Sequence, residues 1–356
     1  MRILITNDRL ETVSGTVAYV KDLSLGLQER GHEVALYSPF VGQTGKEIQS
    51  LGIPVSHSLR ALPFVPDLIH GHHTLETVEA VLYFRFTPVL YVCHDRLAAH
   101  DRPPRLKAIA TYVAVDDNCL DRLLLDAKIS KEKVRVLYNF VNLKRFTPRP
   151  PLPARPQRAA IFSNYAKKNT YVPLIQQACD RMGLSLDVIG LGIGNYAKVP
   201  ESLLGRYDLI FCKAKCALEA MAVGCSVICC DFHGFGGLVT QERFDLMRRY
   251  NFGMKLLNRP FDVDLICQEI ALYDPVEAAH VTERIRQEAS LEKFLDQIEN
   301  LYREIASYPR KEGFDIRIQL ELVRLLKQKI KRSILPHFPF VKSCYTKARN
   351  LFSSAH

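Results

Sequence analysis

The sequence predicts an α/β protein made of two parallel-sheet domains, followed by a helical extension at the C-terminus. Short, nearly continuous apolar runs alternate with helical stretches in both halves of the 356-residue chain. This alternation is typical of parallel strands whose two faces are covered by helices. A proline-rich stretch separates the two halves. A chain of this length is also too long for one ordinary domain.

The first half begins with the strand-like run "RILIT" at residues 2–6. Apolar residues at helical spacing follow over residues 15–30, and Gly31 is a suitable helix end. Five further strands are predicted by the runs "EVALYSP", "DLIHGHH", "PVLYVCHD", "YVAVDD" and "VRVLYN". These elements define a predicted first domain over residues 1–147.

A stiff, extended linker is predicted over residues 148–157, which contain five prolines. The alternation then resumes with the strand-like runs "AAIFSN", "LDVIGLG", "YDLIFCK" and "CSVICCD". We therefore predict a second parallel domain with a helical end over residues 158–308. A basic amphipathic tail is predicted over residues 309–356.

The composition of the chain indicates a globular protein and gives no sign of a transmembrane helix or a metal site. The chain is 47% hydrophobic and 24% charged, as globular proteins are. It contains neither an apolar run long enough for a transmembrane helix nor the apolar region of a signal peptide. Its ten cysteines lack the paired spacing of a zinc site, which favours reduced, buried thiols. We expect a cytoplasmic location and no bound metal.

The tail carries most of the net charge of +10, because residues 311–356 contain ten Lys or Arg and three Asp or Glu. One helical face there is apolar, and basic residues lie beside it. Such helices bind anionic lipid surfaces, so we expect a peripheral position at the inner face of the membrane. The alternative is a helix that packs on the protein itself. No nucleic-acid-binding module is visible.

Ligands of open parallel sheets bind beyond the carboxyl ends of the strands. Gly15 follows the first strand, where a helix start can bind a phosphate, although a simple entry turn would also explain it. The runs "DLIHGHH" and "PVLYVCHD" end in four histidines, namely His70, His72, His73 and His94. These histidines either hydrogen-bond a sugar or phosphate, or are structural residues satisfied by the backbone.

The segment "YDLIFCKAKCALEAMAVGCSVICCD" joins strand, short helix and strand in 25 residues. Lys213 and Lys215 precede its predicted helix, whose first N–H groups favour a phosphate. Glu219 follows on an otherwise apolar helix, where an unpaired carboxylate costs several kcal/mol. The vicinal hydroxyls of a ribose would supply its hydrogen bonds. The alternative is a buried ion pair with Lys213 or Lys215.

These residues carry a family resemblance. The run "ALEAMAVGCSVICCDFHGFGGLV" resembles a segment of the family 4 glycosyltransferases, which have the GT-B fold. Further similar segments, in the family's order, are "GTVAYVKDLSLGLQERGHEVALYSP", "PDLIHGHH", "VLYVCHD", "VRVLYNFVNLKRFTPRP" and "LDVIGLGIG". The resemblance covers about residues 1–305. It implies two Rossmann-like domains that face a cleft, a nucleotide-sugar donor, retention at the anomeric carbon, and no metal or cofactor.

The resemblance also implies roles for single residues. Gly15 would lie near the donor diphosphate, His94 would face the donor sugar, and Glu219 would bind the ribose. The implied donor-binding set is Gly15, Asn164, Lys215, Glu219, Gly236, Gly237 and Leu238. In such enzymes the leaving phosphate is thought to take the acceptor proton, so catalysis depends on stabilising that phosphate. The implied catalytic residues are His94, Lys168 and Lys213.

Three positions depart from the family pattern. Phe211 stands where the family has the first glutamate of its E-x7-E motif, and Asn164 stands at about the position of an arginine that grips the diphosphate. Asn142 replaces the aspartate of the family's "NGVD" segment. Lys213 and Lys215 are candidates to supply the missing positive charge.

The sequence thus favours a retaining glycosyltransferase that acts on a lipid-linked or polysaccharide acceptor in cell-envelope glycan synthesis. One alternative is a non-catalytic nucleotide-sugar-binding or assembly protein of the same fold. Another is a sugar-nucleotide epimerase or hydrolase, for which Asp95, His72 and Asp231 are candidate bases.

Overall fold

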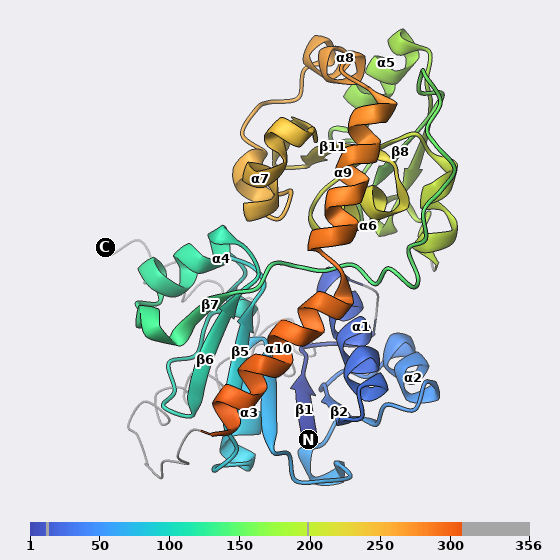
Figure 1. The fold of residues 1–356 in the computed structure, drawn as a ribbon. Coiled ribbons are helices and arrows are strands. Elements are labelled where there is room, and N and C mark those ends of the chain that lie inside the picture. The colour runs from blue at the N-terminus through green and yellow to red at the C-terminus, as the bar shows by residue number, and fades with distance from the viewer. Residues whose placement is uncertain (12–13, 198, 308–356) are drawn as a thin grey trace, which may run out of the picture.

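Two β-sheets organise the structure, as the alternation of apolar runs predicts (Figure 1). The computed structural model describes residues 1–11, 14–197 and 199–307. Each sheet carries its own helices and its own buried apolar cores. The predicted α/β class with two sheet domains is confirmed.

The first sheet has seven strands, and every neighbouring pair in it is parallel. Strands β4 (Leu68–His72) and β5 (Val89–Cys93) are buried at every residue, as parallel strands between two helix layers are. The spatial order is β3 (Val55–Ser56), β2 (Glu33–Tyr37), β1 (Arg2–Thr6), β4 (Leu68–His72), β5 (Val89–Cys93), β6 (Ile109–Ala114) and β7 (Val134–Val136).

Four α-helices connect these strands. Helix α1 (Gly15–Glu29) begins where Ser14 caps it, because the Ser14 hydroxyl accepts the N–H of Val17 at 3.3 Å. Short 3₁₀ or π turns lie at Leu59–Ala61, Ala99–Asp101, Arg122–Asp126 and Lys131–Lys133. The α-helices are α1 (Gly15–Glu29), α2 (Gln43–Ser50), α3 (Thr74–Tyr83) and α4 (Asp117–Asp121).

The second sheet has five strands, in the order β12 (Gly234–Leu238), β11 (Ser226–Asp231), β10 (Leu209–Cys212), β8 (Arg158–Phe162) and β9 (Ser185–Ile189). Four of them are parallel, whereas β12 turns back antiparallel to β11 at the edge. The helices are α5 (Val172–Met182), α6 (Ala214–Val223), α7 (Gln241–Arg249), α8 (Val263–Ala271) and α9 (Pro275–Glu288). Short 3₁₀ turns lie at Leu191–Ile193, Pro200–Ser202, Leu204–Arg206 and Met254–Leu256.

The last described helix, α10 (Leu291–Ala306), returns to the first domain, where Figure 1 shows it in orange beside α1. Its apolar side chains belong to the core of the first sheet. Gly26 of α1 permits this packing, because a Cβ there would lie 2.7 Å from Cδ1 of Leu295. The sequence analysis assigned residues up to 308 to the second domain. The structure differs, because the apolar face of α10 is buried against the first domain.

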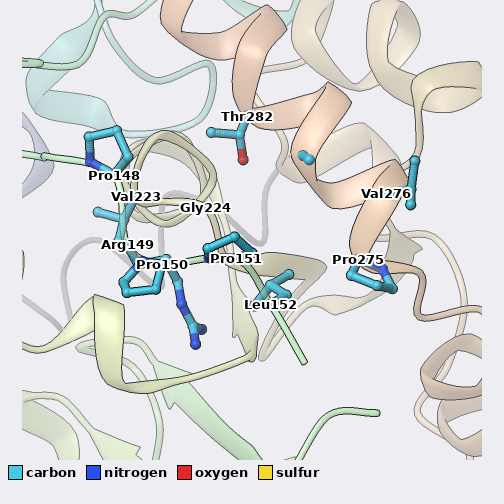
Figure 2. A pocket seen from close by; sticks show the side chains of 11 residues that line it. Pro148, Arg149, Pro150, Pro151, Leu152, Val223, Gly224, Pro275, Val276 and Thr282 are labelled. Carbon is cyan, nitrogen blue, oxygen red and sulfur yellow. The ribbon is translucent and has the colours of Figure 1, made fainter. Parts of the chain in front are cut away.

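The chain passes from the first core to the second between Phe140 and Val141, earlier than the predicted proline-rich linker. The linker itself packs on the second domain, where the guanidinium of Arg149 forms an ion pair with Asp208 at 3.0 Å. Together with the end of α6 and the start of α9, it borders a mostly apolar pocket of about 450 Å³. Figure 2 shows Pro150 and Pro151 across this pocket from α9.

No helix within the described residues is long and apolar enough to cross a membrane. The predicted basic tail, residues 309–356, lies outside the described residues.

The position of α10 leads to a stability prediction. Ile298 has no exposed surface in the core between α10 and the first sheet. Ile298→Ala should lower the free energy of unfolding by about 2–5 kcal/mol, because it leaves a cavity in that core. Urea unfolding followed by circular dichroism measures this change. The control Leu246→Ala removes a side chain that is 55% exposed and should change stability by less than about 0.5 kcal/mol. Equal effects of the two substitutions would contradict the packing of α10.

Candidate functional site

Lys213 lies at the start of α6, at the carboxyl end of β10. Its Nζ forms an ion pair with Asp231, the fully buried last residue of β11. The next residue, Ala214, has a left-handed φ of 53°, which costs a non-glycine residue on the order of 1 kcal/mol. The N–H of Ala214 donates to the carbonyl of Phe252 at 3.2 Å, which holds this turn in place. The structure thus anchors Lys213 at its backbone and at its amine.

The carboxylate of Asp231 has a second partner. Its Oδ1 accepts the backbone N–H of His233 and contacts the ring Nδ1 of the same residue, both at 3.0 Å. Asp231 was a candidate base without a known partner in the sequence; the structure gives it two. A buried carboxylate held in this way positions a cation better than it accepts a proton from a substrate.

Two exposed aromatic rings lie near the amine of Lys213. The ring centroids of Tyr165 and Phe232 lie 5.6 and 5.8 Å from its Nζ, and these residues are 58% and 48% exposed. The two ring centroids are themselves 5.4 Å apart, so the rings form one aromatic surface beside the amine. A cation beside an aromatic surface suits a ligand with both flat apolar and polar surfaces. Sequence analysis missed Tyr165, Phe232 and His233. The available signal was an aromatic residue directly after the polar end of a strand.

Glu219 lies one turn into α6 and is 6% exposed. Its Oε1 is 3.6 Å from the Nζ of Lys215, one helical turn before it. Burial raises the pKa of the Glu219 carboxyl to about 7, although the charge of Lys215 opposes the rise. The structure therefore contains one of the two ion pairs proposed as the alternative for Glu219, namely the pair with Lys215. A ribose would have to share Glu219 with this lysine.

Lys215 also links the two domains. Its Nζ lies 3.6 Å from Oδ2 of Asp22, a fully buried residue of α1, and donates to the carbonyl of Phe140 at 3.3 Å. Oδ1 of Asp22 accepts from Arg145 at 2.8 Å and from the side-chain amide of Asn142 at 3.3 Å. Asn142, the replacement in the family's "NGVD" segment, thus hydrogen-bonds the aspartate of α1.

Arg145 extends this network to Glu201 of the second domain with two hydrogen bonds of 3.0 Å. Asp22 and Arg145 were not predicted as functional residues. An aspartate within the apolar stripe of a helix was the available signal for Asp22. For Arg145, nothing in the sequence indicates the partner, because Glu201 lies 56 positions away.

His94, at the carboxyl end of β5, is half-buried, and its Nε2 lies 2.6 Å from Nδ1 of His72. Burial lowers the pKa of His94 to about 3, so its ring is uncharged at neutral pH. His70 and His72 are fully buried, and Nδ1 of His70 lies 2.5 Å from the hydroxyl of Tyr302. His70 and His72 therefore fit the structural interpretation, whereas His94 remains the candidate for ligand contact.

The other predicted residues lie on loops or helix starts. Gly15 is the exposed first residue of α1, and a Cβ there would meet no atom within 4 Å. Lys168 is exposed in the loop after β8. In the same loop, Oδ1 of Asn164 accepts the N–H of Leu191 at 3.3 Å, which holds the loop after β9. Asn164 therefore has a structural contact where the family has an arginine.

The three residues predicted to bracket the donor through their backbone, Gly236, Gly237 and Leu238, lie inside β12 rather than in a loop. The N–H of Leu238 donates to Oε2 of Glu269 at 2.7 Å, and the carbonyl of Gly236 accepts from Arg259 at 2.8 Å. Both groups are therefore occupied. The difference arises because the chain turns at Asp231 and pairs back onto β11 as an edge strand.

Within the described ranges, no group of three or more His, Cys, Asp or Glu side chains could hold a metal ion.

The raised pKa of Glu219 leads to a pH-dependent prediction. The folded protein keeps a proton on this carboxyl up to about pH 7, whereas the unfolded chain loses it near the ordinary value of 4.5. The contribution of Glu219 to stability therefore falls as the pH rises through this range. In urea unfolding from about pH 5 to about pH 8, Glu219→Gln should gain stability relative to the unaltered protein.

The control for this experiment is Glu47→Gln, which alters an exposed glutamate. Its stability difference from the unaltered protein should stay nearly constant over the same range. A Glu219→Gln difference that does not vary with pH would contradict the raised pKa.

Comparison with known proteins identifies the fold. Residues 13–145 match the sequence model of Glycosyltransferase Family 4, whereas no curated protein sequence matches the chain. A glycosyltransferase from Rickettsia africae has a similar structure, with 16% identity and a TM-score of 0.62 over 86% of this chain and 99% of that chain. Identities this low show a shared fold.

Two further solved structures share this fold. Anabaena HepE, in complex with UDP and glucose, has 15% identity and a TM-score of 0.60, over 85% of this chain and 100% of that chain. WaaG, a glycosyltransferase involved in lipopolysaccharide biosynthesis, has 13% identity and a TM-score of 0.53, over 86% and 100%. The sequence match over residues 13–145 and the shared GT-B fold are consistent with the resemblance of this chain to the family 4 glycosyltransferases, as a divergent relative.

Proposed function

We propose that the protein is a retaining, metal-independent glycosyltransferase that uses a nucleotide-sugar donor. Its acceptor is a lipid-linked or polysaccharide glycan of the cell envelope. The observation that carries the proposal is the cluster of Lys213, Asp231, Tyr165 and Phe232 at the strand ends of the second domain, before the helix that carries Glu219. Ligands of open α/β sheets bind at these ends.

The donor would lie across this cluster. Glu219 would accept hydrogen bonds from the ribose hydroxyls, which favour its ionised form and so oppose the effect of burial on its pKa. Lys213 and Lys215 would lie near the diphosphate, beside the first turn of α6, whose N–H groups also favour an anion. Tyr165 and Phe232 would offer a flat surface to the sugar or the base.

Catalysis would rest on charge stabilisation. When the bond to the sugar breaks, negative charge develops on the leaving diphosphate, and a fixed cation stabilises it more than the ground state. Asp231 holds the Nζ of Lys213 in place, so little reorganisation is needed. Lys168, exposed in the loop after β8, is a second candidate cation. Because the leaving phosphate takes the acceptor proton, no protein base is required.

Two structural relatives support the choice of substrates. The Anabaena protein was solved with UDP and glucose, the parts of a nucleotide sugar, and WaaG takes part in lipopolysaccharide biosynthesis. These facts belong to proteins of 15% and 13% identity. They support a nucleotide-sugar donor and an envelope glycan acceptor as the first substrates to test.

A second candidate function is non-catalytic nucleotide-sugar binding. The observations that favour it are an apolar residue where the family has a glutamate and an ion pair that already involves the lysine of the site. Phe211, at the position of the first family glutamate, is fully buried inside β10. The amine of Lys213 is already paired with Asp231. A site with this composition can bind a donor and yet not stabilise the leaving group.

A direct experiment separates these functions. The full-length protein is screened by thermal shift with UDP-, GDP-, ADP- and CMP-sugars, and nucleotide release is then measured with the donor that raises Tm. A transferase should bind one donor and release its nucleotide.

Lys213→Met should lower kcat about a hundredfold, as loss of one charge-stabilising contact does, with a smaller effect on donor affinity.

Lys167→Met, in the exposed loop after β8, is the control and should leave turnover nearly unchanged. Equal losses of affinity and turnover in Lys213→Met would show that Lys213 binds the donor and does not stabilise the leaving group. A donor that raises Tm without nucleotide release from the unaltered protein would favour the binding protein over the enzyme. If no nucleotide sugar raises Tm, the proposed function is wrong.

The membrane part of the proposal concerns the tail. Residues 311–356 carry seven of the ten net positive charges, and each cation near an anionic surface contributes about 1 kcal/mol of binding free energy. Truncation after residue 310 should release the protein from phosphatidylglycerol vesicles in a sedimentation assay. Neutral phosphatidylcholine vesicles are the control. A truncated protein that still sediments with the anionic vesicles would show that the tail is not the anchor.

A further inference from the structure

Buried rings line up at the carboxyl ends of β4 and β5. The hydroxyl of Tyr302 in α10 contacts Nδ1 of His70 at 2.5 Å, and Nδ1 of His72 contacts Nε2 of His94 at 2.6 Å. The ring centroids of His70 and His72 are 4.6 Å apart, and those of His72 and His94 are 4.8 Å apart. The row runs from the core under α10 to the half-buried His94.

These histidines are uncharged. Burial lowers the pKa of His70 and His94 to about 3, and that of His72 well below its ordinary value. A neutral imidazole has one N–H and one lone pair. At 2.6 Å, one of the two facing nitrogens of His72 and His94 must therefore carry the hydrogen, and the other must accept it. The tautomer of one ring fixes the tautomer of the other.

The surroundings of His72 decide between the two arrangements. Nε2 of His72 is buried without a hydrogen-bond partner among the described residues. A buried N–H without an acceptor is rarer in folded proteins than a buried acceptor without a donor. The hydrogen of His72 therefore belongs on Nδ1, from which it is donated to Nε2 of His94. His94 then carries its own hydrogen on Nδ1.

The position of the His94 ring is fixed independently. The backbone N–H groups of His94 and Asp95 both donate to Oδ2 of the buried Asp101 at 2.6 Å. The ring of Tyr19 packs edge-on against both His72 and His94. A flip of the His94 ring would break the 2.6 Å contact with His72. Nδ1 of His94 has no partner within the described part of the chain.

We propose that His72 is a positioning residue that holds His94 in the Nδ1–H tautomer, so that His94 presents an N–H donor to an oxygen atom of the sugar donor. The role of His94 toward the donor rests on the proposed function, whereas its tautomer does not. In this state His94 has no free lone pair and no charge. It acts as a hydrogen-bond donor and as neither a general base nor a cation.

The tautomer can be measured directly in the full-length protein without any ligand. Long-range ¹H–¹⁵N NMR correlation distinguishes the protonated and unprotonated nitrogens of each histidine, and His94→Gln assigns the His94 signals by their loss. We expect the proton of His94 on Nδ1 at neutral pH. A proton on Nε2 of His94 would overturn the proposal. The exposed His57 gives the reference spectrum of a histidine in solvent.

Two variants of similar size test the role of His72. His72→Asn keeps an N–H group near the position of Nδ1, whereas His72→Leu has none. We expect His94 to keep its tautomer in His72→Asn and to lose it in His72→Leu. The donor KM should rise about tenfold in His72→Leu, as loss of one well-placed hydrogen bond implies, and less in His72→Asn. An unchanged His94 tautomer in His72→Leu would refute the role of His72.

The two proposals fail in different ways. If the Nδ1–H tautomer is found but no nucleotide sugar binds, the proposed function is wrong and the role of His72 in setting the tautomer stands. If a donor binds but His94 carries its proton on Nε2, the role of His72 is wrong and the proposed function stands. If His72→Leu does not fold, the spectra of the unaltered protein and of His72→Asn still decide the question.

Discussion

The contact between Lys215 and Asp22 joins the two domains at the site. Asp22 belongs to α1 of the first domain, Lys215 belongs to α6 of the second, and both side chains are buried. Removing one partner of such a pair leaves an uncompensated buried charge, which costs about 3–5 kcal/mol. The same lysine lies beside Glu219. The position of the candidate ribose-binding carboxylate therefore depends on how the two domains meet.

Two other features hold the domains together around this contact. Lys215 and Arg248 donate to the consecutive carbonyls of Phe140 and Asn139, in the segment where the chain crosses between the cores. Helix α10 then carries the chain back across the first sheet. The crossing segment is thus held by cations from the second domain, and the return helix completes the core of the first. Both connections fix the helices that carry the candidate site.

The two halves of the site differ in their electrostatics. On the first domain, His70, His72 and His94 are uncharged, because burial disfavours the imidazolium form. On the second domain, two lysines lie near buried or nearly buried carboxylates. The first half is therefore suited to hydrogen bonds with a neutral sugar. The second half carries the cations that a diphosphate would require.

The sequence by itself determined the α/β class, ten of the twelve strands within the described residues, and the placement of Lys213 and His94 at strand ends. Apolar periodicity and strand-end polarity are local signals, and they were sufficient for this. Only the tertiary structure decided that α10 packs on the first domain and that β12 turns back as an edge strand. It also decided that Glu219 is paired with Lys215 and that Asp231 holds Lys213. These outcomes depend on contacts between segments far apart in the chain, such as Asp22 with Lys215, and no local pattern encodes which distant partner neutralises a buried charge.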